Sequence, residues 1–542
     1  MEKETQEINK YRDPFLQRAV EHWLDLSNEL GYQPLFCEWL TTRGYVLKYS
    51  IKDTSFEQGK DVVAVSPDGV AHGYQLKGGN ISLKRWRSEV KPEIEALIEI
   101  PIKHPDIDAT KPHVSYLVTN GEIDDSVRED IVGLNQGRWK ETPLKIYTRG
   151  DLLTGFQDIA EGILPKDAVA YKRLMDLIFA DGSGLPNIGE IQSFLYGLLN
   201  IENDKTPKAQ RGRDIAASML YLQMIIGPYR HRKNHGSVVR IQTAFIALMF
   251  HLVDKYQLED KYWLNSYKII WGDLLLVAKQ LEEEINSEGF EASFVDVFDA
   301  DLIPYRKHSA VSIVYPLKLA QHVNDDDAWQ SMLDPSISSK YQKSVSVWSE
   351  ASFVPLIFIA CIFASQNQTK SGAIKVIQNC VDTIIDHNGR KNKDKKAFKP
   401  PYWDVGYSVR VMYGLESINV EDDCKQSSYM IKPLLDALIR FGEKEFVSER
   451  WREISFIRLE EFIPSDSIDV YLWRTESGES RTTLQKKEAS WQELTEEATS
   501  YDGSSLPKTL QRFPDFTAFF ASVFPHRATP DLVGFLFKSS LK

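Results

Sequence analysis

Residues 59–79, with the sequence GKDVVAVSPDGVAHGYQLKGG, constrain the fold more than any other part of the chain. Val62 to Val65 form a short apolar run, rich in β-branched side chains, of the kind found in buried strands. Asp68-Gly69 is a strong signal for a tight turn between paired strands. The sequence therefore predicts two neighbouring strands joined by a hairpin.

Polar residues lie at the ends of both predicted strands. Asp61 comes directly before the first strand, and Gln75 and Lys77 lie on the second. Residues two apart share one face of a strand, so Gln75 and Lys77 are expected to project together while Leu76 points into the core. An acid, an amide oxygen and an ammonium group that converge in this way suit metal-dependent phosphodiester hydrolysis.

Each of these three residues has an expected role. Asp61 would bind Mg²⁺ or Mn²⁺, and the side-chain oxygen of Gln75 would complete the metal's shell. Lys77 would orient or deprotonate the attacking water and stabilise negative charge on the phosphate. The alternative is that an Asp and a Lys at strand ends are ordinary surface residues.

Further elements follow in a definite order. A helical stretch ends at Gly44-Tyr45, and an extended segment, YVLKYSI, covers 45–51. After the hairpin, residues 112–131 are expected to form a strand, a Thr-Asn-Gly turn and a helix. Residues 145–156 are expected to form a last strand and a closing helix.

This pattern resembles the PD-(D/E)xK superfamily of restriction-endonuclease-like nucleases, in the Mrr-type branch that uses Q-x-K. The resemblance covers residues 1–165 and implies an α/β domain with an αβββαβ core that cuts DNA with a divalent metal ion. Gln75 stands where the superfamily more often has glutamate, which removes one negative charge and should weaken metal binding. The resemblance implies that Q-x-K members can still be active.

The superfamily also tends to carry a helical glutamate that faces the metal. Glu38 is the candidate for this role, as a catalytic residue and metal ligand. Glu21 on the preceding helix and Glu57 are the alternatives.

A basic segment, SLKRWRSEVK, follows the second strand. Ser82 can cap a helix whose basic residues would contact DNA phosphates, and whose apolar stripe would pack on the sheet. The nucleic-acid-binding candidates are Lys84, Arg85, Arg87 and Lys91. Pro92 predicts a kink or a restart of this helix. The net charge of −12 means that DNA contact must come from such local patches, and basic runs at 205–213, 230–233 and 390–399 are weaker candidates.

The 542 residues exceed the size of one domain. We expect a nuclease-like domain at 1–165, a helical sensor or assembly domain at 166–460, and a small mixed α/β region at 461–542. Residues 468–475, IDVYLWRT, are expected to form a strand in the last region.

Other sequence features limit the function. The four cysteines form no C-x-x-C pair, and the N-terminus does not resemble a signal peptide, so a cytoplasmic protein is expected. The apolar run at 353–364 is too short to cross a bilayer, so we expect no membrane. A phosphate-binding G-x-x-x-x-G-K-[ST] loop is absent from the sequence, so any ATPase would be a separate protein.

The sequence therefore predicts a Mg²⁺-dependent DNA endonuclease whose cutting is controlled by the helical region. A separate ATPase or sensor protein and a homo-oligomer are expected partners, and the resemblance implies a prokaryotic defence role against phage or plasmid DNA. Two alternatives stay open: a catalytically inactive nucleic-acid-binding module, and a helical scaffold or adaptor that docks a partner protein.

Overall fold

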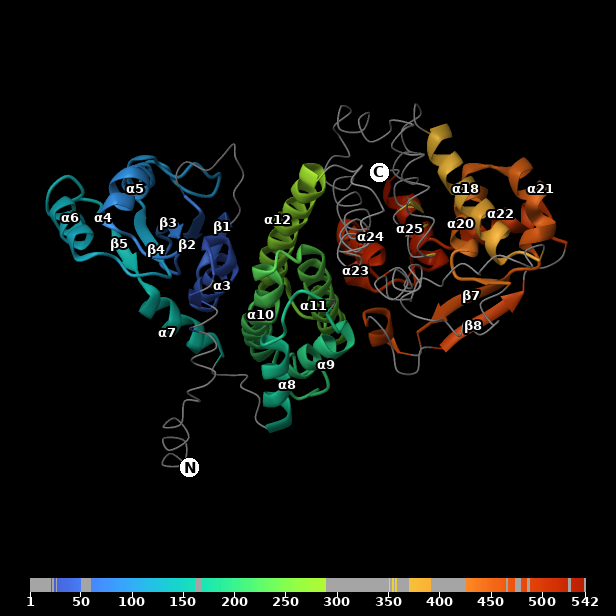
Figure 1. Ribbon diagram of the computed structural model, residues 1–542, viewed down its shortest axis with the longest axis horizontal. Helices are drawn as coiled ribbons and strands as arrows, with labels where there is room; N and C mark the ends of the chain where they lie inside the picture. Colours follow the sequence, from blue (N-terminus) through green and yellow to red (C-terminus); the bar gives the residue numbers. More distant parts are fainter. Residues whose placement is uncertain are drawn as a thin grey trace. The chain divides into compact units, whose positions relative to one another are not determined.

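A computed structural model describes most of the chain (Figure 1). The described residues are 27–49, 60–160, 168–288, 370–390 and 426–540, apart from short gaps at 185, 465, 473–478, 485–487 and 525–527, together with residues 21, 24, 25, 350, 353, 354, 356 and 357. Residues 50, 51, 57 and 59 lie outside the described part, as does most of the 353–364 run.

The chain separates into two compact units. Unit 1 comprises Met1–Pro186, Glu190–Asn234 and Tyr256–Leu274. Unit 2 comprises Asn187–Gly189, His235–Lys255 and Leu275–Lys542. These boundaries differ from the three regions predicted from the sequence.

Unit 1 contains a mixed five-stranded sheet with the strands in the order of the chain (Figure 1). The first three strands are antiparallel neighbours, and the last two run parallel to β3. The strands are β1 (Val46–Tyr49), β2 (Val62–Val65), β3 (Ala71–Lys77), β4 (Val114–Thr119) and β5 (Lys145–Tyr147).

The predicted hairpin is confirmed. Val62 pairs with Tyr74 and Val65 with Ala71, and Gly69 has a φ of +82° in the turn between them. Glycine adopts that left-handed conformation with less strain than residues that carry a Cβ. The predicted strand, turn and helix at 112–131 and the closing strand and helix at 145–156 are also confirmed.

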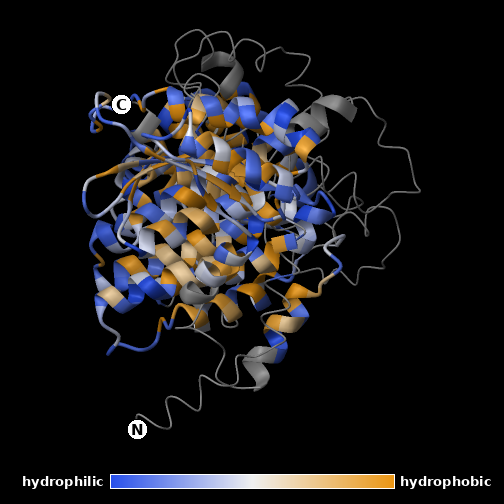
Figure 2. Cartoon of the chain, turned by 90° about the vertical axis from the view of Figure 1, so that its left-hand side faces the viewer, coloured by the Kyte–Doolittle hydropathy of each residue, from blue (hydrophilic) through white to orange (hydrophobic). Residues whose placement is uncertain are grey.

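Helices cover both faces of the sheet. Phe36 of α3 (Glu29–Thr42) packs edge-on against Tyr74 and Tyr147, so α3 covers one face together with α7 (Arg149–Ala160). On the other face, a hydrophobic cluster joins α5 (Lys91–Glu99) and α6 (Asp125–Gln136) to Leu117 of β4. Hydrophobic and hydrophilic segments alternate along the helices in Figure 2, as one-sided packing requires.

The basic segment forms three successive turns of different winding. Ser82 caps α4 (Leu83–Arg85), a π-helical turn covers Trp86–Val90, and α5 begins at Lys91. Pro92 has no N–H and would clash with the carbonyl group one α-turn earlier, and the wider π turn directly before α5 accommodates it. The predicted break at this proline is therefore confirmed, and the predicted apolar stripe of Val90, Ile94, Leu97 and Ile98 packs in the core.

Helices beyond residue 165 also belong to unit 1. The first residues of α12 and part of α10 pack on α3, on the side away from the sheet. Their bounds are α8 (Ala168–Ile178), α9 (Ile188–Leu198), α10 (Lys208–His231), η2 (Asp260–Tyr262) and α12 (Leu264–Glu288). Ile188, Gly189 and the part of α12 from Leu275 on are assigned to unit 2. The predicted boundary at 165 therefore cuts through a packed unit.

Unit 2 packs helices around one hydrophobic cluster beside a three-stranded sheet, ordered β6-β7-β8. The strands are β6 (Ser427–Ser428), β7 (Arg458–Ile463) and β8 (Glu479–Leu484). The helices are α11 (His235–Tyr256), α18 (Lys370–Asn388), α20 (Ile431–Phe441), α21 (Lys444–Ile454), η7 (Ser467–Val470), α22 (Trp491–Ser500), α23 (Lys508–Arg512), α24 (Pro514–Val523) and α25 (Pro530–Ser540).

Two features of unit 2 bear on the sequence predictions. The strand predicted at 468–475 is wrong in its described part, because Asp466 and Asp469 form a capping box that starts the short helix η7. Among the described residues, α11 is the one helix long and apolar enough to cross a membrane, and its most apolar stretch is entirely buried within the fold.

Candidate functional site

The end of β3 brings together the polar residues predicted from the hairpin. Asp61 Oδ2 accepts two hydrogen bonds, from Gln75 Nε2 at 2.8 Å and from the main-chain N–H of Leu76 at 2.7 Å. Its own N–H donates to the Tyr74 carbonyl oxygen, which holds Asp61 in register directly before β2. Asp61 and Gln75 therefore lie side by side on one face of the sheet, as predicted.

Only the nitrogen of the Gln75 side-chain amide has a hydrogen-bond partner. Its nitrogen donates to Asp61, whereas Oε1 is buried and has no hydrogen-bond partner. A buried amide oxygen left without a partner is unusual, because its desolvation is uncompensated. The amide also exchanges donor for acceptor by a half-turn of its terminal bond. Gln75 can therefore offer an oxygen to a cation placed beside Asp61.

Lys77 lies on the same face but points towards acidic side chains. Its Nζ is 2.6 Å from Glu93 Oε2 and 3.6 Å from Glu89 Oε1. Burial alone would lower the pKa of Lys77, but Glu93, Glu29 and Glu89 together raise it above its ordinary value. Lys77 is therefore an ammonium group held by carboxylates.

Glu38 has a different environment from the one predicted. Its carboxylate is buried against α12, where it accepts hydrogen bonds from Ser266 Oγ at 3.2 and 3.3 Å. Burial raises the pKa of Glu38 to about 7, although the Ser266 hydrogen bonds act in the opposite direction. Phe36 contacts the sheet, and Glu38, two residues later, lies about 200° further around the helix. Glu38 therefore faces away from Asp61. The expectation that Glu38 faces the metal is not supported.

Glu29 is the helical carboxylate that α3 brings towards the site. It occupies the first turn of α3, and its charge raises the pKa of both Lys77 and Tyr32. Tyr32 itself donates to the main-chain oxygen of Lys77 at 3.0 Å. Glu29, Tyr32 and Phe36 are spaced three, four and seven residues apart, so they share one helix face. That spacing was the available sequence signal for Glu29.

The two alternatives to Glu38 do not replace it. The Glu21 charge acts on Arg149, which pairs with Asp25. Glu57 lies outside the described residues.

The predicted DNA-binding residues divide into two kinds. Arg85 donates to the main-chain oxygen of Gly78 at 2.7 Å, and Lys91 pairs with Asp130 at 3.0 Å. Both therefore have partners within the domain. Lys84 and Arg87 are exposed and line a shallow surface hollow, so they are the residues of the four best placed to meet phosphates.

The donors around Asp61 fit a hard divalent cation. Among the described residues, no three His, Cys, Asp or Glu side chains are grouped as a metal site. One carboxylate, Asp61, and one buried amide oxygen without a partner, on Gln75, are nevertheless present. Mg²⁺ is commonly bound through one or two carboxylates and keeps several waters, so this small set of oxygens is sufficient.

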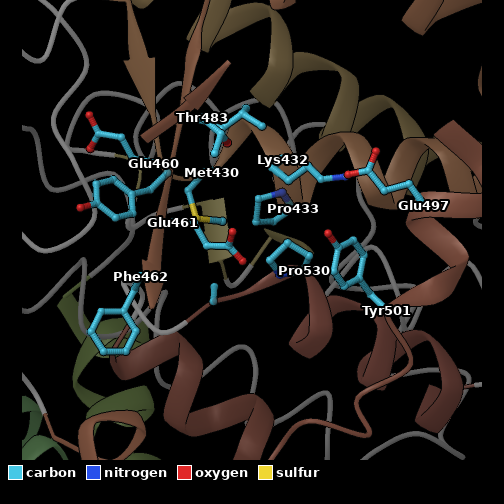
Figure 3. A pocket seen from close by; sticks show the side chains of 13 residues that line it. Met430, Lys432, Pro433, Glu460, Glu461, Phe462, Thr483, Glu497, Tyr501 and Pro530 are labelled. Atoms are coloured by element: carbon cyan, nitrogen blue, oxygen red, sulfur yellow. The ribbon is translucent and has the colours of Figure 1, made fainter. Parts of the chain in front are cut away.

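A pocket of about 190 Å³ lies in unit 2 between α20, β7 and α22 (Figure 3). Lys432 reaches Glu497 at 2.9 Å and the buried Asp436 at 2.7 Å. Glu461 points into the pocket, whereas Glu460 lies on the opposite side of β7 in this view. The lysine charge is thus already balanced by two carboxylates, and this pairing ties α20 to α22.

No family model, curated protein or solved structure matches this chain.

Proposed function

We propose that unit 1 carries a metal-dependent DNA endonuclease of the restriction-endonuclease-like type. The observation that supports this most directly is the contact between Asp61 and Gln75, which leaves an amide oxygen buried without a partner beside an acid. Lys77 ends the same strand and supplies a positive charge. Acid, amide and amine on one sheet face match the needs of phosphodiester hydrolysis.

Each of these side chains would have its own role in the proposed reaction. Asp61 and Gln75 would hold the divalent metal ion, with Glu29 of α3 as a further carboxylate near the site. Bound Mg²⁺ or Mn²⁺ would polarise the phosphate and lower the pKa of a bound water. Lys77 would stabilise the negative charge that develops on the phosphate oxygens. Lys84 and Arg87 would contact the phosphate backbone beside the scissile bond.

We further propose that the helical part of the chain controls cutting. A nuclease without sequence selectivity would damage the DNA of its own cell, so activity in the cytoplasm has to be restrained. The resemblance to the superfamily makes prokaryotic defence the setting that we propose.

A plasmid-cleavage assay in Mg²⁺ or Mn²⁺ tests the proposed reaction. Asp61→Ala and Lys77→Ala should each lower the cleavage rate at least about 100-fold, because each removes charge stabilisation at the reacting phosphate. The exposed residues Asp125 and Lys140 provide matched controls, and their alanine variants should cleave like the wild type. Cleavage that survives both site substitutions would place the reaction elsewhere, whereas binding without cleavage in either metal would favour the inactive module.

A further inference from the structure

The proposed site is almost closed. Asp61, Gln75 and Lys77 are 7, 6 and 5% exposed. The side chains of Glu89 and Glu93, which contact Lys77, are 46 and 38% exposed. These two carboxylates therefore lie between the Lys77 ammonium and solvent, and a phosphate can reach Lys77 only when they move.

Both carboxylates come from one helical segment that is tied to the end of β3. Arg85 donates to the main-chain oxygens of Gly78 at 2.7 Å and Asn80 at 3.2 Å. The same guanidinium donates to both oxygens of Glu89, at 3.2 and 3.3 Å. Arg85, Glu89 and Glu93 recur every four residues, so one face of the segment carries the whole arrangement.

We propose that Glu89 and Glu93 form an acidic clamp that competes with a DNA phosphate for Lys77. This inference rests on the proposed function. A carboxylate and a phosphodiester carry the same sign of charge, so they exclude each other from one partly buried ammonium. Glu29 adds a third negative charge near Lys77. The clamp keeps the site latent, and DNA binding must displace it.

The exposed bases of the same segment link DNA binding to this release. Lys84 lies one position before Arg85, and Arg87 lies two positions before Glu89. A phosphate backbone drawn to Lys84 and Arg87 therefore acts on the helical turns that carry the clamp. The π-helical turn between Arg85 and Lys91 carries Glu89, and such turns within helices are frequent at functional sites.

DNA affinity tests the clamp without any need for cleavage. Binding of a short fluorescein-labelled duplex to the full chain is measured by anisotropy in EDTA. Glu93→Gln should bind about tenfold more tightly than the wild type, because Lys77 becomes available to phosphate. Glu95 is the matched control: it lies on the same helix, is 30% exposed and pairs with Arg138 instead of Lys77. Glu95→Gln should change affinity less than about twofold.

A second background separates the clamp from simple loss of charge. In a Lys77→Met variant, adding Glu93→Gln should give no further gain in affinity. A gain that is equal for Glu93→Gln and Glu95→Gln, or that persists without Lys77, would overturn the clamp. Unchanged affinity would also overturn it. If one of these results is obtained while the wild type binds and cuts DNA, the clamp is wrong and the proposed function stands. If no variant binds or cuts DNA, the proposed function fails as well.

Discussion

Changing Gln75 to glutamate should make the stability of unit 1 depend on divalent metal. Gln75 Nε2 donates to Asp61 Oδ2 at 2.8 Å, and both side chains are buried. Glutamate replaces the donor by an oxygen, so two carboxylates would face each other across hydrogen-bond distance. Like charges this close cannot both stay ionised, and the pair takes up a proton.

The size of the effect follows from that proton. Keeping one carboxyl group protonated at about pH 7.5 costs about 4 kcal/mol, because its ordinary pKa is about three pH units lower. The hydrogen bond within a carboxyl–carboxylate pair offsets about 1 kcal/mol of this. The free energy of unfolding should therefore fall by about 3 kcal/mol without metal. Mg²⁺ at about a hundred times its dissociation constant should return about 2.7 kcal/mol.

Thermal unfolding of the full chain, in EDTA and in Mg²⁺, measures both halves of this prediction. Gln75→Glu should unfold at a lower temperature than the wild type in EDTA and gain more from Mg²⁺. The matched control combines Gln75→Glu with Asp61→Asn, which exchanges donor and acceptor and keeps a single carboxylate. The double variant should recover stability in EDTA and gain no more from Mg²⁺ than the wild type does. If Gln75→Glu is as stable as the wild type in EDTA, the two side chains do not face each other.

Three further substitutions test the packing within unit 1. Burial raises the pKa of Glu38 from 4.5 to about 7 in the folded state. Between pH 4.5 and about pH 7 the unfolded chain therefore releases a proton that the folded chain retains. The free energy of unfolding should fall across this range as the pH rises, by up to about 3 kcal/mol. Glu38→Gln should remove that loss, and urea unfolding at about pH 5 and pH 8 should show the two proteins diverging; parallel curves would contradict the burial. Gly121→Ala should destabilise unit 1 by about 3 kcal/mol in the same measurement, because its Cβ would overlap the main chain of Gly79 and Asn80. The control is Gly133→Ala on α6, whose Cβ meets open space, so the free energy of unfolding should rise by up to about 1 kcal/mol.

The sheet could be predicted because its signals are local. Val62 to Val65 show strand character within four residues, and Asp68-Gly69 fixes the turn that sets the register of β2 against β3. Once the register is fixed, alternation places Gln75 beside Asp61. The contact that carries the proposed function was therefore predictable without knowledge of distant residues.

The acidic surroundings of the site were harder to predict because they depend on helix phase. Glu38 is the helical glutamate predicted to face the metal, but Phe36 shows that the opposite side of α3 meets the sheet. Glu29, seven residues before Phe36, has the correct phase. The approach of Glu93 to Lys77 depends in addition on the π-helical turn, which changes the winding between Arg85 and Lys91. Pro92 predicts a break there, but it does not predict which side chain then reaches Lys77.

The boundary of unit 1 could not be predicted because it depends on contacts between distant segments. Ser266 donates to Glu38 across 228 residues of sequence, and Asn265 donates to Thr41 at 2.9 Å. Hydrophobic periodicity identifies α10 and α12 as packed helices but does not say which partner they cover. The helices therefore looked like a separate domain in the sequence.

The ion pairs made by basic residues within the protein bear on how the proposed activity could be controlled. Runs of positive charge in the sequence suggested DNA-binding patches, but Arg230 pairs with Asp273 and Arg232 with Asp181. Arg85 is used in the same way, within its own domain. These three guanidinium groups are therefore already paired, and the net charge of −12 repels DNA. Since Lys77 is itself held by carboxylates, DNA binding by the isolated chain should be weak. Cutting should then depend on a partner that brings positive charge to the clamp.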